Sequence, residues 1–238
     1  MPSAIVTGAS RGIGRAIAEA LGADGYALTL TARKPEPLAA TAADLRAAGY
    51  EVQQIAGNIS DEEAISAVVA LHRERHGRLD VLVNSAGFGA GAIAGEHRTR
   101  FVDIQLDVNL RAIILMYREA LDLLKAAGAE HRRALVVNMA SLAGKSPQPW
   151  LSVYGATKAG VIAYTQAMNK ELNGDGIRSV ALCPGFVDTD MTEFIRDSVP
   201  QEQMIRTDDV VAAVRFVLSL SPTAVVPEIV FQRPGETI

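Results

Sequence analysis

Short β-branched or apolar runs alternate with Ala-rich segments of helical length along this 238-residue chain. Each run is bounded by polar or turn residues, as expected of a strand that is buried on both faces of a sheet. The predicted strands cover residues 4–6, 27–31, 52–55, 81–83, 135–137, 180–182 and 229–231. The segments between them predict helices over residues 15–22, 38–48, 62–76, 101–127, 154–172 and 208–220.

This alternation predicts an α/β fold. Strand–helix–strand units with right-handed crossovers give a parallel sheet covered on both faces, so we expect a Rossmann-like, doubly wound sheet of about seven strands. A single α/β domain commonly reaches this length, and no internal repeat or Pro/Ser-rich linker divides the chain. We therefore expect one domain over residues 1–238.

Composition argues against several classes of protein. Lys and Arg total 23 against 27 Asp and Glu, so no broad basic surface for nucleic acid or anionic membrane is expected. No apolar stretch reaches the roughly 18 to 20 residues of a membrane-spanning helix, and the first residues do not resemble a secretion signal, which favours a cytoplasmic protein. The one cysteine, Cys183, cannot form an intrachain disulfide and is expected to be buried.

The histidines are not arranged as metal ligands. They are His72, His76, His97 and His131, and none of them shares a ligand spacing with another. We expect these side chains to be solvated and expect no bound metal.

A glycine-rich turn follows the first predicted strand and opens the first predicted helix. It reads Thr7-Gly8-Ala9-Ser10-Arg11-Gly12-Ile13-Gly14. Gly8 permits the tight turn, Gly12 lets the backbone approach a pyrophosphate, and Gly14 lets the helix pack closely on the sheet. The helix N-terminus offers free N–H groups to phosphate. The turn predicts a dinucleotide site, although a purely structural strand-to-helix turn has the same spacing.

The end of the second predicted strand favours NADP over NAD. NAD sites of this type place an acidic side chain there for the ribose 2′-hydroxyl, whereas this chain reads Thr31-Ala32-Arg33-Lys34. Without that carboxylate, a 2′-phosphate can pair with Arg33, assisted by Arg11 and flanked by Lys34. The alternative is that these three residues are ordinary surface charges.

Tyr154 and Lys158 lie four residues apart at the start of a predicted helix, on one face of it. A tyrosine normally titrates near pH 10, so its use as an acid or base near neutrality requires a neighbouring cation that stabilises the phenolate. Lys158 is placed to supply that cation. Ser141 offers a neutral hydroxyl that can hold a carbonyl oxygen.

Taken together, these motifs resemble the short-chain dehydrogenase/reductase family over nearly the whole chain. The motifs are the Thr-Gly-x-x-x-Gly-x-Gly turn, the segment Asn84-Ser85-Ala86-Gly87, and a serine thirteen residues before Tyr-x-x-x-Lys. The resemblance implies hydride transfer between NADP(H) and a carbonyl or alcohol carbon. Ser141 would orient the substrate, Tyr154 would exchange the proton, and Lys158 would lower the pKa of Tyr154 and bind the nicotinamide ribose. Asn109 would hold a water that links Lys158 to solvent; otherwise it is a polar helix residue.

The resemblance also extends the cofactor site beyond the glycine-rich turn. It implies contacts from Asn58 and Ile59 at the adenine, from Asn84, Ala86 and Gly87 at the adenine ribose, and from Pro184, Gly185, Val187 and Thr189 at the nicotinamide. Asn58 stands where the family often carries an aspartate, but an amide can still hydrogen-bond adenine. A turn role for Asn84 and helix capping by Thr189 are the structural alternatives.

The substrate region suggests a small apolar or aromatic carbonyl or alcohol substrate. Met191, Phe194 and Ile195 have helix-like spacing and resemble a lid, and Leu142, Trp150 and Phe186 add apolar surface, although core packing explains each of them equally well. We expect a homo-oligomer, either a dimer or a tetramer. The segment at 231–236 departs from the Gly-Gly pattern with which the family commonly forms its tetramer, which puts that assembly in doubt.

Two other functions are left open by the sequence. A 3-oxoacyl-[acyl-carrier-protein] reductase would need a basic docking patch, for which Arg98, Arg100, Arg132 and Arg133 are candidates. A non-catalytic NADP-binding sensor would keep the cofactor site without the chemistry, and such a protein would usually lack the tyrosine or the lysine.

Overall fold

All seven predicted strands are present and form one parallel sheet. The computed structural model describes residues 1–235. The strands are β1 Ser3–Thr7, β2 Ala27–Ala32, β3 Val52–Ala56, β4 Val81–Asn84, β5 Ala134–Met139, β6 Ile177–Pro184 and β7 Glu228–Phe231. Their order in the sheet is β3-β2-β1-β4-β5-β6-β7, so the chain turns back at β1 and winds outward in both directions. The predicted Rossmann-like, doubly wound fold is confirmed.

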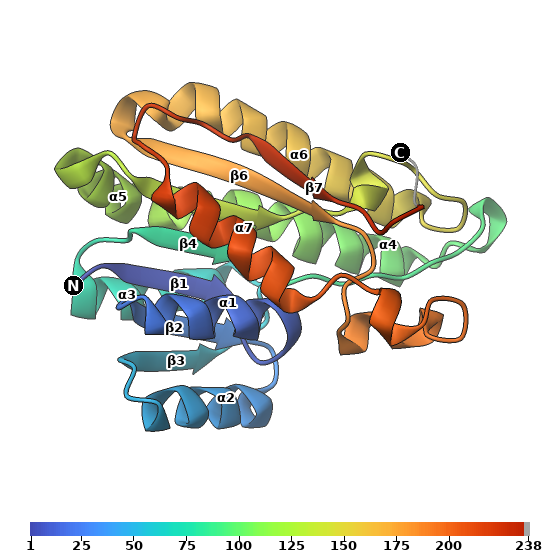
Figure 1. The fold of residues 1–238 in the computed structure, drawn as a ribbon, viewed down its shortest axis with the longest axis horizontal. Helices are drawn as coiled ribbons and strands as arrows, with labels where there is room; N and C mark the ends of the chain where they lie inside the picture. The colour runs from blue at the N-terminus through green and yellow to red at the C-terminus, as the bar shows by residue number, and fades with distance from the viewer. Residues whose placement is uncertain (236–238) are drawn as a thin grey trace.

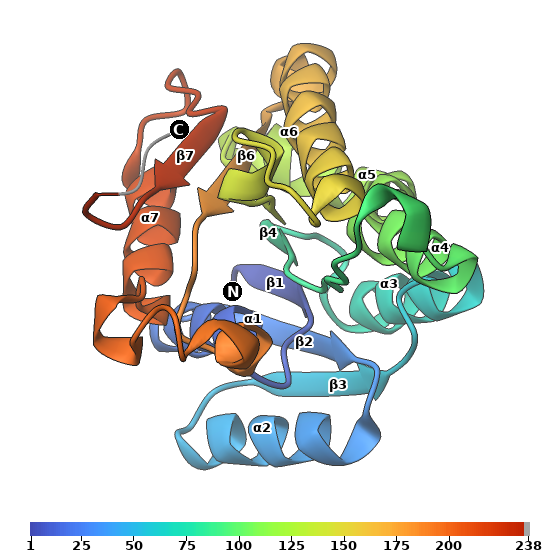
Figure 2. The ribbon, with the colours of Figure 1, turned by 90° about the vertical axis from the view of Figure 1, so that its right-hand side faces the viewer.

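The register brings the carboxyl ends of the strands to one edge of the sheet. Thr7 at the end of β1 pairs with Thr31 of β2 on one side and with Asn84 of β4 on the other. Asn84 in turn pairs with Asn138 of β5. Figure 1 shows the strand arrows pointing the same way, and Figure 2 views this edge with its loops toward the reader. Loops that follow different strands therefore meet there.

Helices cover both faces of the sheet, as the alternation predicted. They are α1 Gly12–Ala23, α2 Pro35–Ala47, α3 Glu62–His76, α4 Thr99–Leu106, α5 Ala112–His131, α6 Ser152–Leu172 and α7 Thr207–Ser219. In Figure 2, α1, α2 and α7 lie on one face, and α3 to α6 lie on the other. Strand residues alternate between the two apolar cores, so Val6 packs under α1 while its neighbour Ile5 faces α3 and α5.

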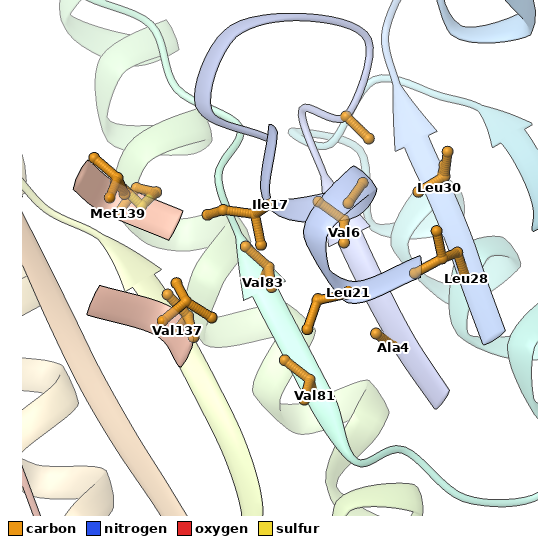
Figure 3. Close-up of a cluster of buried hydrophobic side chains, with 14 of the residues drawn as sticks. Ala4, Val6, Ile17, Leu21, Leu28, Leu30, Val81, Val83, Val137 and Met139 are labelled. Carbon is orange, nitrogen blue, oxygen red and sulfur yellow. The ribbon is translucent and has the colours of Figure 1, made fainter. Parts of the chain in front are cut away.

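Figure 3 shows the core beneath α1, where Ile17 and Leu21 lie over Val6, Val83 and Val137. All five side chains are almost completely buried. Because an α-helix repeats every 3.6 residues, Ile17 and Leu21 lie on the same face, and their burial holds the helix onto the sheet directly behind the glycine-rich turn. The core thereby fixes the position of the helix N-terminus.

The long helix predicted over residues 101–127 is interrupted. Helix α4 ends at Leu106, the π-helical segment η2 spans Asp107–Arg111, and α5 begins at Ala112. Sequence periodicity does not distinguish a π-helical turn from an α-helical one, and π-turns are frequent at functional sites. Asn109, a predicted site residue, lies within it.

The expectation that the histidines are solvated is wrong for His72. Its side chain is fully buried and bonds to the hydroxyls of Ser3 and Thr29 and to the main-chain carbonyl oxygen of Arg78. His76 and His131 are half-buried, and only His97 is exposed. These partners come from other elements of the fold, so a single-sequence pattern does not reveal them.

Two further expectations concern Cys183 and the C-terminal segment. Cys183 is buried as expected, and burial raises the pKa of its thiol to about 12. The part of the 231–236 segment that falls on Glu236 lies outside the described residues. No helix in the described part of the chain is long and apolar enough to cross a bilayer.

Candidate active site

The glycine-rich turn has the geometry that a phosphate-binding loop requires. Gly8 and Gly12 have φ values of 66° and 55°, a backbone conformation that favours glycine. A Cβ atom on Gly14 would overlap the carbonyl oxygen of Gly8, so the first turn of α1 lies directly against the loop. No side chain caps the N-terminus of α1. Its N–H groups and positive dipole end are therefore available to an anion.

The turn is in contact with loops that follow two other strands. A Cβ atom on Gly8 would approach the backbone of Ala86 to 2.9 Å, and one on Gly12 would stand 3.2 Å from the Thr189 methyl group. Arg11 forms an exposed ion pair of 2.8 Å with Asp190. The segment after β6 therefore lies beside the phosphate loop, and the predicted nicotinamide contacts of Val187 and Thr189 stay a prediction. The ion pair also ties Arg11 to a residue of this chain, which the sequence did not predict.

The basic residues at the end of β2 are exposed. The side chains of Arg33 and Lys34 are open to solvent, directly beyond the last residue of the strand. Nearby, Thr31 keeps a buried hydroxyl without a partner among the described residues. A 2′-phosphate at this strand end would meet two cations and no carboxylate from the strand. The residues present fit an NADP-type cofactor.

The two residues predicted to contact adenine, Asn58 and Ile59, differ in exposure. Asn58 is exposed, and its amide contacts Asp61 while its carbonyl oxygen accepts from Ser60 N–H. Ile59 is buried in the core beside α3. Only the backbone of Ile59 is left to face a ligand, whereas Asn58 can offer its side chain.

Asn84 faces the interior of the sheet. Its amide donates to the side-chain oxygen of Asn138 over 2.9 Å, and its own Oδ1 is buried without a partner among the described residues. Asn138 donates in turn to Tyr117 and Thr165. The structure thus places the Asn84 side chain in a buried polar network. The backbone of Ser85 and Ala86, rather than this side chain, borders the glycine-rich turn, and Gly87 lies beside Asn109 and Lys158 instead.

The Pro-Gly segment after β6 borders the same edge of the sheet. Pro184 ends β6, and its carbonyl oxygen lies 3.4 Å from the Ser141 hydroxyl. Gly185 donates its N–H to Phe231 of β7. Val187 is buried and bridges to Ile205. Ser10 and Ile13 of the glycine-rich turn pack toward α2 and the core respectively.

The structure brings Ser141, Tyr154 and Lys158 together from the end of β5 and the first turns of α6. Ser141 begins the short helix η3 (Leu142–Gly144), and its hydroxyl accepts the N–H of Ala143. Ser141 also hydrogen-bonds the phenol of Tyr154. The Lys158 ammonium lies 5.6 Å from the centre of the Tyr154 ring and donates to the main-chain carbonyl oxygen of Met139 over 2.7 Å.

Burial dominates the electrostatics of this group. Burial raises the pKa of Tyr154, against which the hydrogen bond from Ser141 acts, and burial lowers the pKa of Lys158 to about 8. The expectation that Lys158 lowers the Tyr154 pKa is not met by the protein groups alone, because the ammonium is directed to Met139 rather than to the phenol oxygen. No sequence pattern pointed to Met139, because its contribution is a main-chain carbonyl.

Asn109 lies close to the Lys158 end of this group. Its side-chain oxygen accepts from Phe88 N–H, and its amide donates to Phe88 C=O and to the Thr157 hydroxyl. A Cβ atom on Gly87 would stand 3.6 Å from Asn109 Oδ1 and 3.8 Å from Lys158 Nζ, so Gly87 lies next to both of these groups. The Asn109 side chain clamps the loop after β4 onto α6, and the predicted relay water stays a prediction.

The predicted lid forms a short 3-10 helix. This helix, η5, spans Asp190–Ile195, and Thr189 caps it in a capping box with Thr192. Met191 and Phe194 are exposed, and Ile195 is half-buried. Of the other apolar candidates, Leu142 is buried, Phe186 lies beneath the guanidinium of Arg233, and Trp150 pairs with Phe194. The alternative role of Thr189 as a helix cap is thus confirmed.

A cavity of about 560 Å³ opens beside the loop after β4. It is lined by Ala90, Gly91, Ala92, Glu96, His97, Arg98, Phe101, Val102 and Gln105. None of the four predicted catalytic side chains lines it. The cavity therefore lies between this loop and α4 and does not include the predicted catalytic side chains.

Comparison with known proteins identifies the family. The family model described as short chain dehydrogenase matches residues 2–200. The chain belongs to the short-chain dehydrogenase family. Among its relatives is a protein of Streptomyces violaceoruber, described as a ketoacyl reductase of the granaticin polyketide synthase. It is 36% identical over 94% of this chain and 89% of its own length.

Further similarities within the short-chain dehydrogenase family are to a 3-oxoacyl reductase and an alcohol dehydrogenase. A 3-oxoacyl-[acyl-carrier-protein] reductase of Staphylococcus aureus is 34% identical over 85% of this chain and 81% of its own. The structure of an alcohol dehydrogenase from Thermococcus sibiricus, complexed with 5-hydroxy-NADP, superposes with a TM-score of 0.87. It is 32% identical and covers 99% of this chain and 100% of that one. This chain is thus an oxidoreductase of that family.

Proposed function

We propose that this protein transfers a hydride between NADP(H) and a carbonyl or alcohol carbon, with Ser141, Tyr154 and Lys158 as its catalytic residues. The observation that carries the proposal is the convergence of these three side chains where the strands end, beside a glycine-rich turn open to phosphate. The NADP-type ligand of the Thermococcus structure supports the cofactor. Exposed Arg33 and Lys34 at the end of β2 support it independently.

Each side chain has a role in the proposed reduction. The bound cofactor supplies a hydride to the carbonyl carbon. The Ser141 hydroxyl holds the carbonyl oxygen, and Tyr154 donates its phenol proton to the oxygen as negative charge develops there. The nearby cation of Lys158 then stabilises the phenolate that remains. Alcohol oxidation uses the same groups in reverse.

The raised pKa of Tyr154 suits a proton donor. A phenol that stays protonated through neutral pH can act as an acid in every turnover, provided that its conjugate base is stabilised during the reaction. Lys158, with a pKa lowered to about 8, is charged at neutral pH and can supply that stabilisation. Asn109 is proposed to help position Lys158, because its side chain fixes Phe88 in the loop after β4.

Reduction of a 3-oxoacyl thioester is the second candidate, because two of the relatives are described as ketoacyl or oxoacyl reductases. Its predicted docking arginines fall at two places. Arg98 and Arg100 follow the carboxyl end of β4, on the side of the proposed active site. Arg132 and Arg133 precede β5 and lie at the opposite edge of the sheet. Only the first pair supports a docking role.

The assembled catalytic group argues against a non-catalytic sensor, since a sensor has no use for a buried lysine beside a serine–tyrosine pair. We keep a homodimer or tetramer as a proposal. Exposed apolar side chains on α4, among them Phe101 and Leu106, support an association surface there.

The test is to offer the protein a panel of ketones, aldehydes and a 3-oxoacyl thioester and to monitor the oxidation of NADPH or NADH with each. We expect NADPH oxidation with at least one carbonyl and a lower kcat/KM with NADH. A higher kcat/KM for the thioester than for every simple ketone would favour the 3-oxoacyl reductase as the function. NADPH binding without turnover of any substrate would contradict the proposal and favour the sensor.

A further inference from the structure

Trp150 adopts a conformation that bulky residues rarely adopt. Its φ is 59°, and only one other non-glycine residue among the described positions, Arg132, has a positive φ. Such a conformation is unfavourable for an L-residue, so it persists only where surrounding contacts require it. One such contact is a hydrogen bond of 2.8 Å from Ala92 N–H to the carbonyl oxygen of Trp150.

The Trp150 ring bridges two loops that follow different strands. On one side it lies directly on Gly91, where any Cβ atom would overlap ring atoms Cε3 and Cζ3. On the other it meets Phe194 of η5 edge to face, with the ring centroids 5.9 Å apart and the planes at 85°. Trp150 thus joins the loop after β4 to the lid after β6.

A second glycine relates Trp150 to the catalytic tyrosine. A Cβ atom on Gly89 would stand 3.7 Å from two ring atoms of Tyr154. Gly89 is thus in ordinary contact with the Tyr154 ring, while Gly91, two residues on, must be a glycine to admit the Trp150 ring. Tyr154 is half-buried, whereas Trp150 and Phe194 keep 40% and 62% of their surface exposed, so Trp150 lies outward of Tyr154 along this loop.

We infer that Trp150 is a specificity-determining residue that, with Phe194, borders the approach to Tyr154 along the loop after β4 and selects carbonyls carrying flat apolar groups. This inference rests on the proposed function. The exposed parts of the Trp150 and Phe194 rings offer an apolar surface against which an aromatic or planar group can pack. The Trp150 ring, fixed between two loops, blocks wide or branched groups. The contacts with Gly91, Phe194 and Ala92 hold the ring in place before any substrate arrives.

The activity test compares a flat aryl methyl ketone with a branched ketone of similar size. In Trp150→Gly the strained backbone is relieved and the ring is removed. We expect KM for the aryl ketone to rise about tenfold with kcat changed less than about threefold, so that the preference moves toward the branched ketone. Phe216→Leu, which alters an exposed aromatic on α7, is the control and should retain the wild-type preference.

Two further measurements cover a Trp150→Gly variant that fails to fold. Gly91→Ala keeps the indole but forces it off the loop, and should shift the substrate preference in the same direction. Trp150 is the only tryptophan in the chain, so fluorescence quenching by acrylamide reports its exposure directly. Quenching should increase in Phe194→Leu and stay unchanged in Phe216→Leu.

The outcomes separate this inference from the proposed function. Active Trp150→Gly or Gly91→Ala enzyme with the wild-type ranking of ketones would overturn the role of Trp150 and leave the function standing. Unchanged quenching in Phe194→Leu would overturn the aromatic contact on which that role depends. A wild-type protein that oxidises NADPH with no carbonyl at all would overturn both.

Discussion

The ammonium group of Lys158 donates a hydrogen bond to the main-chain carbonyl oxygen of Met139 over 2.7 Å. This contact holds the charge under the Tyr154 ring, 5.6 Å from its centre, in a place where almost no side-chain surface of Lys158 reaches water. One neutral carbonyl compensates poorly for the lost hydration of an ammonium ion, which is why burial lowers the pKa of Lys158. The position of this cation therefore costs folding stability.

The cost of burying Lys158 predicts an unusual dependence of stability on pH. The pKa of Lys158 is about 8 in the folded chain and has its ordinary value of 10.5 in the unfolded chain, so between these values the unfolded chain holds a proton that the folded chain lacks. Stability contributed by this site therefore rises as pH rises from about 8 to 10.5, by about 3 kcal/mol in total. Urea unfolding of wild type and Lys158→Met at pH 7 and pH 10 measures it. The free energy of unfolding of wild type should increase relative to that of Lys158→Met at the higher pH. An equal difference between the two proteins at both pH values would contradict the buried charge.

Cofactor preference tests the basic strand end. Arg33→Asp replaces a cation by the acidic group typical of NAD sites, so the ratio of kcat/KM for NADPH over NADH should fall by at least about tenfold. Arg73→Asp, which makes the same change of charge at an exposed position of α3, controls for net charge. Equal ratios in wild type and Arg33→Asp would remove Arg33 from the cofactor site.

The strands and motifs were predictable from sequence because their signals are local. Buried parallel strands are apolar throughout, and the glycines of the turn and the four-residue spacing of Tyr154 and Lys158 are fixed by neighbouring positions. The π-helical turn around Asn109, the inward direction of Asn84 and the conformation of Trp150 were not predictable. Each depends on contacts between segments distant in sequence, such as that of Asn109 with Phe88.

The buried network between β4 and β5 predicts unequal effects of two similar mutations. Asn138→Ala leaves Tyr117, Thr165 and Asn84 each without one hydrogen-bond partner, and should lower the free energy of unfolding by more than about 2 kcal/mol. Asn84→Ala removes one hydrogen bond together with an unpartnered oxygen, so its cost should be smaller, about 1 kcal/mol. Chemical denaturation of the two variants measures both costs, and equal losses of unfolding free energy would contradict the proposed roles of Asn138 and Asn84 in the network.

The buried His72 predicts loss of stability in mild acid. Burial lowers its pKa from 6.5 to about 4, so below pH 6.5 the unfolded chain binds a proton that the folded chain does not. The free energy of unfolding should therefore fall by about 3 kcal/mol between pH 6.5 and 4 through this residue. His72→Gln removes that contribution while His76 and the carboxylates still titrate. The variant should lose less stability than wild type over this range, and parallel losses would refute the assignment.

The most direct test of the account is the single-turnover rate of NADPH oxidation in wild type and Tyr154→Phe, each saturated with NADPH and with the best ketone of the panel. The variant keeps the ring beside Gly89 and loses only the hydroxyl. The account predicts a rate lower by roughly 100- to 10,000-fold with NADPH affinity unchanged. A Tyr154→Phe enzyme that oxidises NADPH at the wild-type rate would contradict the claim that this phenol supplies the proton.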